Sequence, residues 1–221
     1  TPRKEYAAFV SNTDEAIGRV LDYLDLKGLT EDTIVIFQSD HGHSLEERAF
    51  WDGGSSGPYR GSKFSMFEGG IRVPAIIRYP KKIPANQVRD QLATGMDWFA
   101  TIADLSGSHV AENIDGKSLM PIILDEKGES EHDVVHWQLG GYDDRTAQWA
   151  VRKGPWKLIG NVREPQGKEG QKADLPKLFL VNLDNDISEQ NNLAASHPKK
   201  LDALLELHKT WLISVRAEKS K

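Results

Sequence analysis

The segment at residues 33–44, "TIVIFQSDHGHS", joins an apolar run directly to residue types that bind metal ions. Residues 33–37 are apolar on both faces, which is typical of a central parallel strand that helices cover on both sides. The run is followed by Asp40, His41 and His43. Because ligands bind beyond the carboxyl ends of strands in an open parallel sheet, the segment predicts a functional site at this strand tip.

The chemistry of the strand tip has two interpretations. Asp40 offers a hard anionic oxygen and His41 a neutral nitrogen, and adjacent residues can converge on one cation where the backbone leaves its pleat. Gly42 permits such a sharp turn. In the alternative, Asp40 caps a following helix and both histidines are solvated loop residues. The short pattern Asp-His-Gly leaves both open.

The residues around this strand predict an α/β domain. Apolar residues recur at helical spacing over residues 4–27, and the run "VPAIIRY" at residues 73–79 is similar to the first buried strand. The long loop at residues 42–70 is rich in glycine, serine and charge, which indicates a functional loop. Two strands buried on both faces need neighbours at their edges, so we expect this chain to be the C-terminal part of a larger protein.

The second half of the chain changes character. Four short apolar segments separated by turn residues predict an antiparallel meander: "VVHWQL", "QWAVRKG", "WKLIGN" and "LFLVNL". An amphipathic helix at about residues 198–215 is expected to cover this sheet. We therefore assign residues 1–128 to the C-terminal part of a large α/β domain and residues 129–221 to a small α+β domain.

Composition excludes several classes of function. The 221 residues carry a formal net charge of −5, so the sequence gives no basic field for nucleic acid. The chain contains no cysteine, which excludes disulfides, thiolate metal sites and a cysteine nucleophile within it. No apolar run has the length of a membrane span.

Four motifs in a fixed order carry a family resemblance. "IVIFQSDHG" is followed by "RGSK", then by "FEGGIRVPAIIRYP" and then by "IDGKSLMPIIL". This order resembles the C-terminal half of sulfatases in the alkaline phosphatase superfamily, and "AVRKGPWKLI" and "LFLVNLDNDISEQNNLA" look like that family's small C-terminal domain. The resemblance implies an alkaline-phosphatase-like α/β fold: part of a mixed, mostly parallel sheet with helices on both faces, then a small antiparallel sheet and a C-terminal helix.

The resemblance implies roles for individual residues. The family's metal-binding pair matches Asp40 and His41, which would bind one divalent cation, usually Ca²⁺. Lys63 matches the lysine that contacts the sulfate and stabilises charge on the leaving oxygen. His43 is a further candidate for substrate binding, and a surface histidine is the alternative. The nucleophile, a formylglycine, and the remaining metal ligands are expected upstream of this chain, which alone would be inactive.

One further motif is a decoy. Residues 56–60, "SGPYR", fit the family's "C/S-x-P-x-R" formylglycine motif letter for letter. They follow the metal motif instead of preceding it, and Arg60 already belongs to "RGSK", so we reject Ser56 as the nucleophile precursor. The other residues that match the family are assigned to structure: Glu68, Gly69, Gly70, Arg72 and Pro74.

The resemblance implies a hydrolase that removes sulfate from a sulfated small molecule or glycan, in a periplasmic or secreted location. Its expected protein partner is the missing N-terminal part of the same polypeptide. Arg48, Trp51 and Tyr59 offer the cations and aromatic faces that sulfated sugars favour, whereas Trp137 is expected to pack between the two domains. The alternatives are a phosphoester or phosphonate hydrolase of the same superfamily and a noncatalytic glycan-binding relative.

Overall fold

The computed structural model describes residues 1–49, 53–110, 113–141, 143, 145–165 and 175–218. The chain forms two compact units, each built from separate segments of the sequence. The sheet unit contains residues 1–12, 39–74 and 134–221, and the strand-pair unit contains residues 13–38 and 75–133. The boundary predicted between residues 128 and 129 stays a prediction. Within the described ranges, no helix is both long enough and apolar enough to cross a bilayer.

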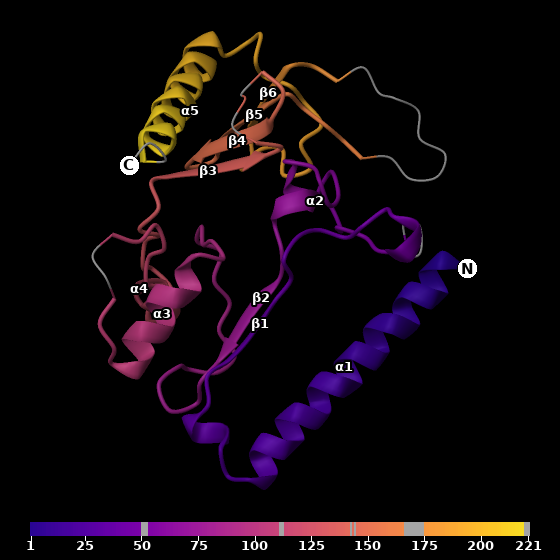
Figure 1. Cartoon of the computed structure of the whole chain (residues 1–221), viewed down its shortest axis with the longest axis vertical. Coiled ribbons are helices and arrows are strands. Elements are labelled where there is room, and N and C mark those ends of the chain that lie inside the picture. Colours follow the sequence, from indigo (N-terminus) through magenta and orange to yellow (C-terminus); the bar gives the residue numbers. More distant parts are fainter. Residues whose placement is uncertain (50–52, 111–112, 142, 144, 166–174, 219–221) are drawn as a thin grey trace. The chain divides into compact units, whose positions relative to one another are not determined.

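Helices and strands alternate in the first half of the chain, and strands dominate the second (Figure 1). The described helices are α1 (Pro2–Leu26), α2 (Glu68–Ile71), α3 (Asp97–Ser106), α4 (Met120–Leu124) and α5 (Pro198–Glu218), with 3-10 turns at Thr30–Asp32 and Glu47–Ala49. The strands are β1 (Val35–Gln38), β2 (Ala75–Arg78), β3 (Val134–Leu139), β4 (Gln148–Lys153), β5 (Trp156–Gly160) and β6 (Leu178–Asn182). The helix predicted over residues 4–27 is confirmed as α1.

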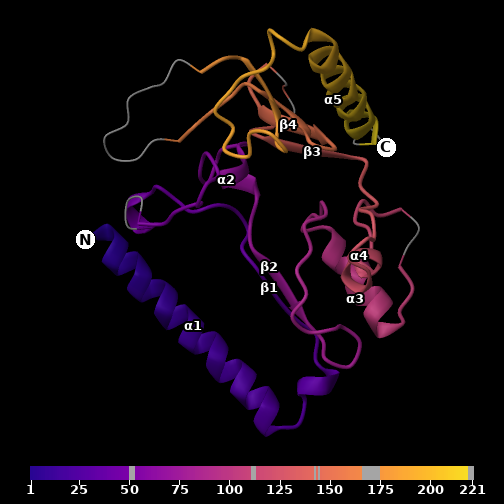
Figure 2. The ribbon, with the colours of Figure 1, turned by 180° about the vertical axis from the view of Figure 1, so that it is seen from behind.

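The sheet unit is built on an antiparallel meander. Strands β3, β4, β5 and β6 are hydrogen-bonded in chain order, which confirms the prediction for the second half of the sequence. Side chains alternate across the sheet, so Val151 packs with Leu204 of α5, while the preceding Ala150 packs on the other side with Phe67. Figure 2 shows α5 lying along this sheet, as the amphipathic pattern predicted.

A charged cluster lies in the interior of the sheet unit. Lys157 of β5 is fully buried, and its Nζ lies 2.8 Å from Glu68 Oε1 and 3.0 Å from Glu189 Oε1. Burial acts to raise the pKa of Glu68, but the charge and hydrogen bond of Lys157, together with the charges of Arg152 and Arg72, outweigh it and lower that pKa. Burial raises the pKa of Glu189. The cluster therefore joins α2 to the sheet through an ammonium that has no access to water.

Replacing Lys157 with methionine is expected to destabilise the full-length protein by about 3–5 kcal/mol, because it removes the buried cation that Glu68 and Glu189 share. Urea unfolding measures this loss of free energy. Lys177→Met removes an exposed lysine near the same sheet and is the matched control, with little expected effect. Equal stability of the two variants would contradict a structural role for Lys157.

Two histidines stack on tryptophans where α5 covers the sheet. His136 of β3 lies 4.8 Å from Trp211 between ring centroids, and His208 of α5 lies 3.8 Å from Trp149. The pKa of His136 is lowered from 6.5 to about 4, because burial penalises the charged ring and His208 lies nearby. The neutral form of His136 is therefore the one that fits this interface.

The stability of the protein should fall as the pH decreases from about 6.5 to about 4, and His136 should contribute to this fall. In that interval the unfolded state binds a proton at His136 that the folded state does not. Urea unfolding at pH 7.5 and pH 5 should show a smaller loss of stability for His136→Gln than for the wild type. The exposed His197→Gln variant is the control, and an unchanged pH dependence in His136→Gln would refute the assignment.

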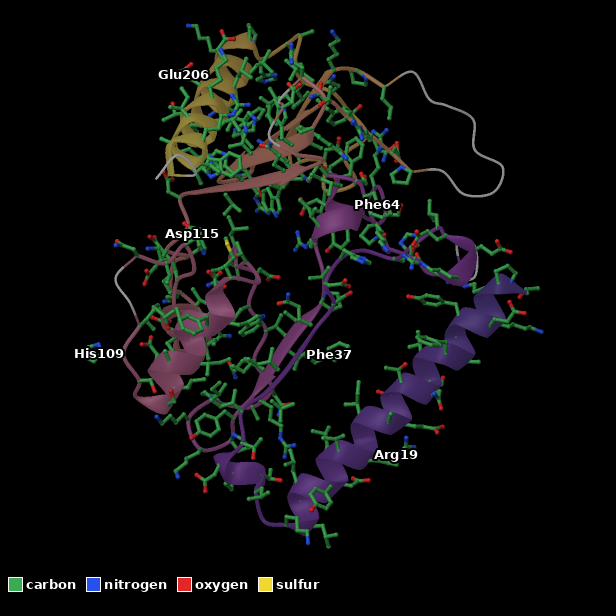
Figure 3. All side chains as sticks on the ribbon, viewed as in Figure 1. Arg19, Phe37, Phe64, His109, Asp115 and Glu206 are labelled. Atoms are coloured by element: carbon green, nitrogen blue, oxygen red, sulfur yellow. The ribbon has the colours of Figure 1, made fainter. Side chains whose placement is uncertain are left out.

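The strand-pair unit contains a correction to the sequence analysis. Strands β1 and β2 pair antiparallel, with Ile36 opposite Ile77. The prediction that both are parallel strands is wrong for this pair, because apolar residues on both faces indicate burial and carry no information on direction. Phe37 of β1, labelled in Figure 3, and Ile76 of β2 are exposed. Phe37 and Ile76 are paired directly opposite each other, so one face of this strand pair contains apolar residues that the described chain leaves exposed.

A buried carboxylate organises the helical part of the strand-pair unit. Asp97, at the start of α3, accepts the N–H groups of Thr94 at 2.6 Å and Lys117 at 2.9 Å. Its Oδ1 also lies 2.7 Å from His132 Nε2. Asp97 thus fixes the motif "IDGKSLMPIIL", whose helix α4 packs against β2 through Ile77.

Candidate functional site

The candidate site lies on the site loop, residues 39–74, within the sheet unit. Two of its segments are joined by backbone hydrogen bonds from Gly42 N–H to Gly70 O and from Lys63 N–H to His43 O, each 2.9 Å long. A β-carbon at Gly42 would lie 1.8 Å from the carbonyl oxygen of Gly69, so glycine is required there. This close approach fixes Gly42 and His43 against the segment that contains Lys63.

Asp40 and His41 lie together at the end of β1. The distance between Asp40 Oδ2 and His41 Nε2 is 3.1 Å, and the two side chains are 82% and 37% exposed. Ser39 Oγ donates a hydrogen bond of 2.8 Å to His41 O, which holds the backbone after the strand in its turn. The two side chains thus converge at the strand tip and are open to a ligand.

The hydrogen bonding of His41 indicates what the pair can bind. His41 Nδ1 lies 2.8 Å from Gly42 O, and since a carbonyl oxygen only accepts, Nδ1 carries the proton. The lone pair of the neutral ring then lies on Nε2, facing a carboxylate oxygen that is also rich in electrons. Two such atoms repel each other unless a cation or a proton lies between or beside them.

A divalent cation fits this pair of donors, since carboxylate oxygen and imidazole nitrogen are both metal ligands. The described residues contain no group of three or more His, Cys, Asp or Glu side chains that could hold a metal ion. Asp40 and His41 would therefore need further ligands to complete a coordination shell.

Lys63 is held in place by a carboxylate that the sequence analysis did not single out. Its side chain is 16% exposed, and its Nζ donates to Glu46 Oε2 at 3.1 Å. The same oxygen accepts hydrogen bonds from Ser44 and Arg48. These contacts lower the pKa of Glu46 from 4.5 to about 2, with Arg48 as the largest cause. Glu46 is therefore an anion beside the ammonium at any working pH.

Ser56, the first residue of the rejected formylglycine motif, lies next to His43, the second candidate for substrate binding. His43 Nδ1 lies 2.9 Å from Ser56 Oγ, which is also 3.0 Å from Gly61 O. The hydroxyl donates to the carbonyl and accepts from the ring, so Nδ1 of His43 carries the proton. Ser56 thus orients a histidine next to the strand tip, which is a structural reason for a serine there. Its rejection as nucleophile stays a prediction.

Other residues from the sequence analysis have structural contacts. Arg72 pairs with Glu68 at 3.6 Å, as expected for an ion pair. Arg60 pairs with Glu164 at 2.7 Å and lies 4.1 Å from the centroid of the Phe67 ring. Trp137 is partly buried and packs against the hydrophobic cluster that contains Phe67, and its predicted packing between the two domains stays a prediction. Trp51 lies outside the described residues.

Sequence reasoning missed Glu46 because its signal was weak. It follows the metal motif in the string "SLEER", where two acids and an arginine are typical of any solvated loop. Its partner Lys63 is 17 residues away, so no helical or strand spacing joins them. The acid became recognisable only when the fold brought the two together.

Two family models match this chain. The model described as Sulfatase matches residues 1–108, and the model described as N-sulphoglucosamine sulphohydrolase, C-terminal, matches residues 61–212. The second match covers more than half of the chain. The chain belongs to the sulfatase family.

Individual relatives agree with the family models. A sulfatase of Formosa agariphila is 31% identical over 96% of this chain. An N-acetylgalactosamine-6-O-sulfatase of Bacteroides thetaiotaomicron is 32% identical over 89% of this chain. Each match covers 40% of the relative. The solved structure of Ps i-CgsB in complex with k-i-k-neocarrahexaose has a TM-score of 0.79 and 26% identity, over 96% of this chain and 43% of that one.

These relatives bear on the fold and on the extent of the chain. The likeness to solved sulfatases confirms the predicted alkaline-phosphatase-like α/β fold, with a small antiparallel sheet and a C-terminal helix. The match spans about two fifths of the length of each of these three relatives.

Proposed function

We propose that the full-length protein is a hydrolase that cleaves sulfate esters of carbohydrates. The observation that carries this proposal is the site loop, where Asp40 and His41 converge at a strand tip and Lys63 is hydrogen-bonded through its backbone to the same turn. Each of these residues occupies a sulfatase motif position. Relatives named for a sulfated amino sugar or solved with a carrageenan oligosaccharide favour a carbohydrate substrate.

The reaction consumes one water and converts a sulfate ester into an alcohol and inorganic sulfate. The sulfate group is anionic throughout, and negative charge develops on the bridging oxygen as the S–O bond breaks. The Lys63 ammonium supplies positive charge for these oxygens from a fixed position, so little reorganisation is needed during the reaction. We assign Lys63 to this role and His43 to substrate binding.

We assign Asp40 Oδ and His41 Nε2 as ligands of one Ca²⁺ ion, which would stabilise negative charge on the sulfate oxygens when bound. Calcium is favoured over zinc because the further ligands of a sulfatase site are expected to be carboxylates. The nucleophile, a formylglycine, would come from another part of the protein. We further propose that the full-length protein is periplasmic or secreted.

The Asp40→Ala variant of the full-length protein is expected to lose calcium binding, because a carboxylate ligand carries much of the attraction for this hard cation. Calorimetric titration of metal-stripped protein with calcium measures the loss. Asp202→Ala removes an exposed acid from α5 and should titrate like the wild type. If Asp40→Ala bound calcium as tightly as Asp202→Ala, the metal assignment would be wrong.

The Lys63→Ala variant is expected to turn over an aryl sulfate roughly a hundredfold more slowly or worse, the scale of losing one charged stabiliser of the transition state. The rate constant kcat should fall more than KM rises, because charge on the bridging oxygen appears only as the bond breaks. Calcium binding should remain. Steady-state kinetics and the same calorimetric titration test both expectations.

Ser56→Ala provides the comparison for Lys63→Ala. It removes a hydrogen bond worth about 1 kcal/mol and should keep turnover within about tenfold of the wild type, since Ser56 orients His43 and is not the nucleophile. An inactive Ser56→Ala enzyme beside an active Lys63→Ala enzyme would reverse the assignment of the two residues.

A further inference from the structure

A single carboxylate oxygen accepts hydrogen bonds from two cations of the site loop. Glu46 Oε2 accepts hydrogen bonds from Lys63 Nζ at 3.1 Å, from Arg48 Nε at 3.1 Å and Nη2 at 3.0 Å, and from Ser44 Oγ at 3.0 Å. Ser44 and Arg48 lie close to Glu46 in the sequence, whereas Lys63 comes from the other side of the loop. Glu46 is therefore the point where the two sides of the loop meet through side chains.

We propose that Glu46 is a positioning residue that holds the Lys63 ammonium in the orientation needed for the anionic group of the substrate. This inference rests on the proposed function, because it concerns how Lys63 is presented to a sulfate ester. Glu46 acts through Lys63 and needs no contact of its own with the substrate.

The charge balance explains why a carboxylate can stand beside a lysine that binds an anion. Arg48 donates two N–H groups to Glu46 and already compensates its negative charge. With Lys63 included, two cations surround one anion and the cluster retains one net positive charge. That charge belongs to the lysine, whose remaining N–H groups are available to donate in other directions.

The burial of the partners separates this cluster from an ordinary surface ion pair. Exposed pairs of long side chains contribute little, because both side chains lose conformational freedom when they pair. Arg48 fits that description, with a side chain that is 75% exposed. Lys63 differs, since its side chain is 16% exposed and its Nζ lies 4.9 Å from the centroid of the Phe64 ring. The protein has thus already restricted Lys63, and Glu46 sets the direction of its ammonium.

The backbone supports the same orientation. The N–H of Lys63 donates to His43 O at 2.9 Å, so the residue is tied at its main chain to the strand tip and at its ammonium to Glu46. A lysine fixed at both ends can meet the developing charge without first paying the entropy of ordering its four rotatable bonds. Loss of Glu46 would release only the ammonium end.

The test uses Glu46→Gln in the full-length enzyme, with Glu47→Gln as the matched control. Both variants remove one negative charge from adjacent positions, but Glu47 is exposed and belongs to the 3-10 turn Glu47–Ala49. Glu46→Gln should lower kcat by roughly ten- to a hundredfold, the scale of one charge-assisted hydrogen bond, with a smaller change in KM. Glu47→Gln should keep the kcat of the wild type.

A double-mutant cycle with Lys63→Met shows whether Glu46 acts through the lysine. In the Lys63→Met background, Glu46→Gln should cause no further loss of kcat, because the group it positions is gone. Glu46→Asp, which keeps the charge on a shorter side chain, should recover part of the activity. Thermal unfolding and calcium titration of each variant identify any loss of activity that comes from misfolding.

Three outcomes would overturn the proposal. Glu46→Gln could have the kinetics of Glu47→Gln, it could lower KM and raise kcat, which would mean that Glu46 competes with the substrate for Lys63, or it could cause an equal loss in the Lys63→Met background. Failure of the proposed function is a different result: either the wild type does not hydrolyse sulfate esters, or Lys63→Met alone retains full turnover.

Discussion

The arrangement of the sheet unit depends on the buried ammonium of Lys157. This one group satisfies carboxylates from α2 and from the segment after β6, and Glu189 also accepts the backbone N–H of Glu68 at 2.5 Å. Segments separated by up to 121 residues in sequence therefore meet at one point. Because Gly69 of α2 makes the close approach to Gly42, the buried cluster also sets where the strand tip lies. The interior of the sheet unit thus influences the geometry of the site.

Arg60 lies in the site loop, but its contacts indicate a structural role. Arg60 lies in both "SGPYR" and "RGSK", and its guanidinium is occupied by Glu164, by the backbone oxygen of Glu189 at 3.0 Å and by the faces of Phe67 and Phe179. A guanidinium with so many protein partners serves to anchor the loop. These contacts are evidence separate from the order of the motifs. They agree with the prediction that "SGPYR" has a structural role.

Sequence reasoning succeeded where the signal was local and failed where it depended on the fold. The periodicity of α1 and α5 and the meander of short strands follow from neighbouring residues. The sequence could not predict whether β1 and β2 pair parallel or antiparallel. Apolar residues on both faces of a strand indicate that it is buried, but they do not indicate its direction. The ion-pair partners of Lys63 and Lys157 could not be predicted either, because they lie far from these lysines in the sequence and become neighbours only in the fold.

The charge of the chain restricts what it can contribute to binding the sulfated substrate proposed above. The formal net charge is −5, and acidic residues outnumber basic ones even in the site loop: Asp40, Glu46, Glu47, Asp52 and Glu68 against Arg48, Arg60, Lys63 and Arg72. Arg60 and Arg72 are already paired with carboxylates. This part of the protein therefore provides no long-range positive field for a polyanion. Under the proposed function, this part of the protein contributes a few fixed charges at contact distance, such as the Lys63 ammonium, which Glu46 holds at its end and His43 through the backbone.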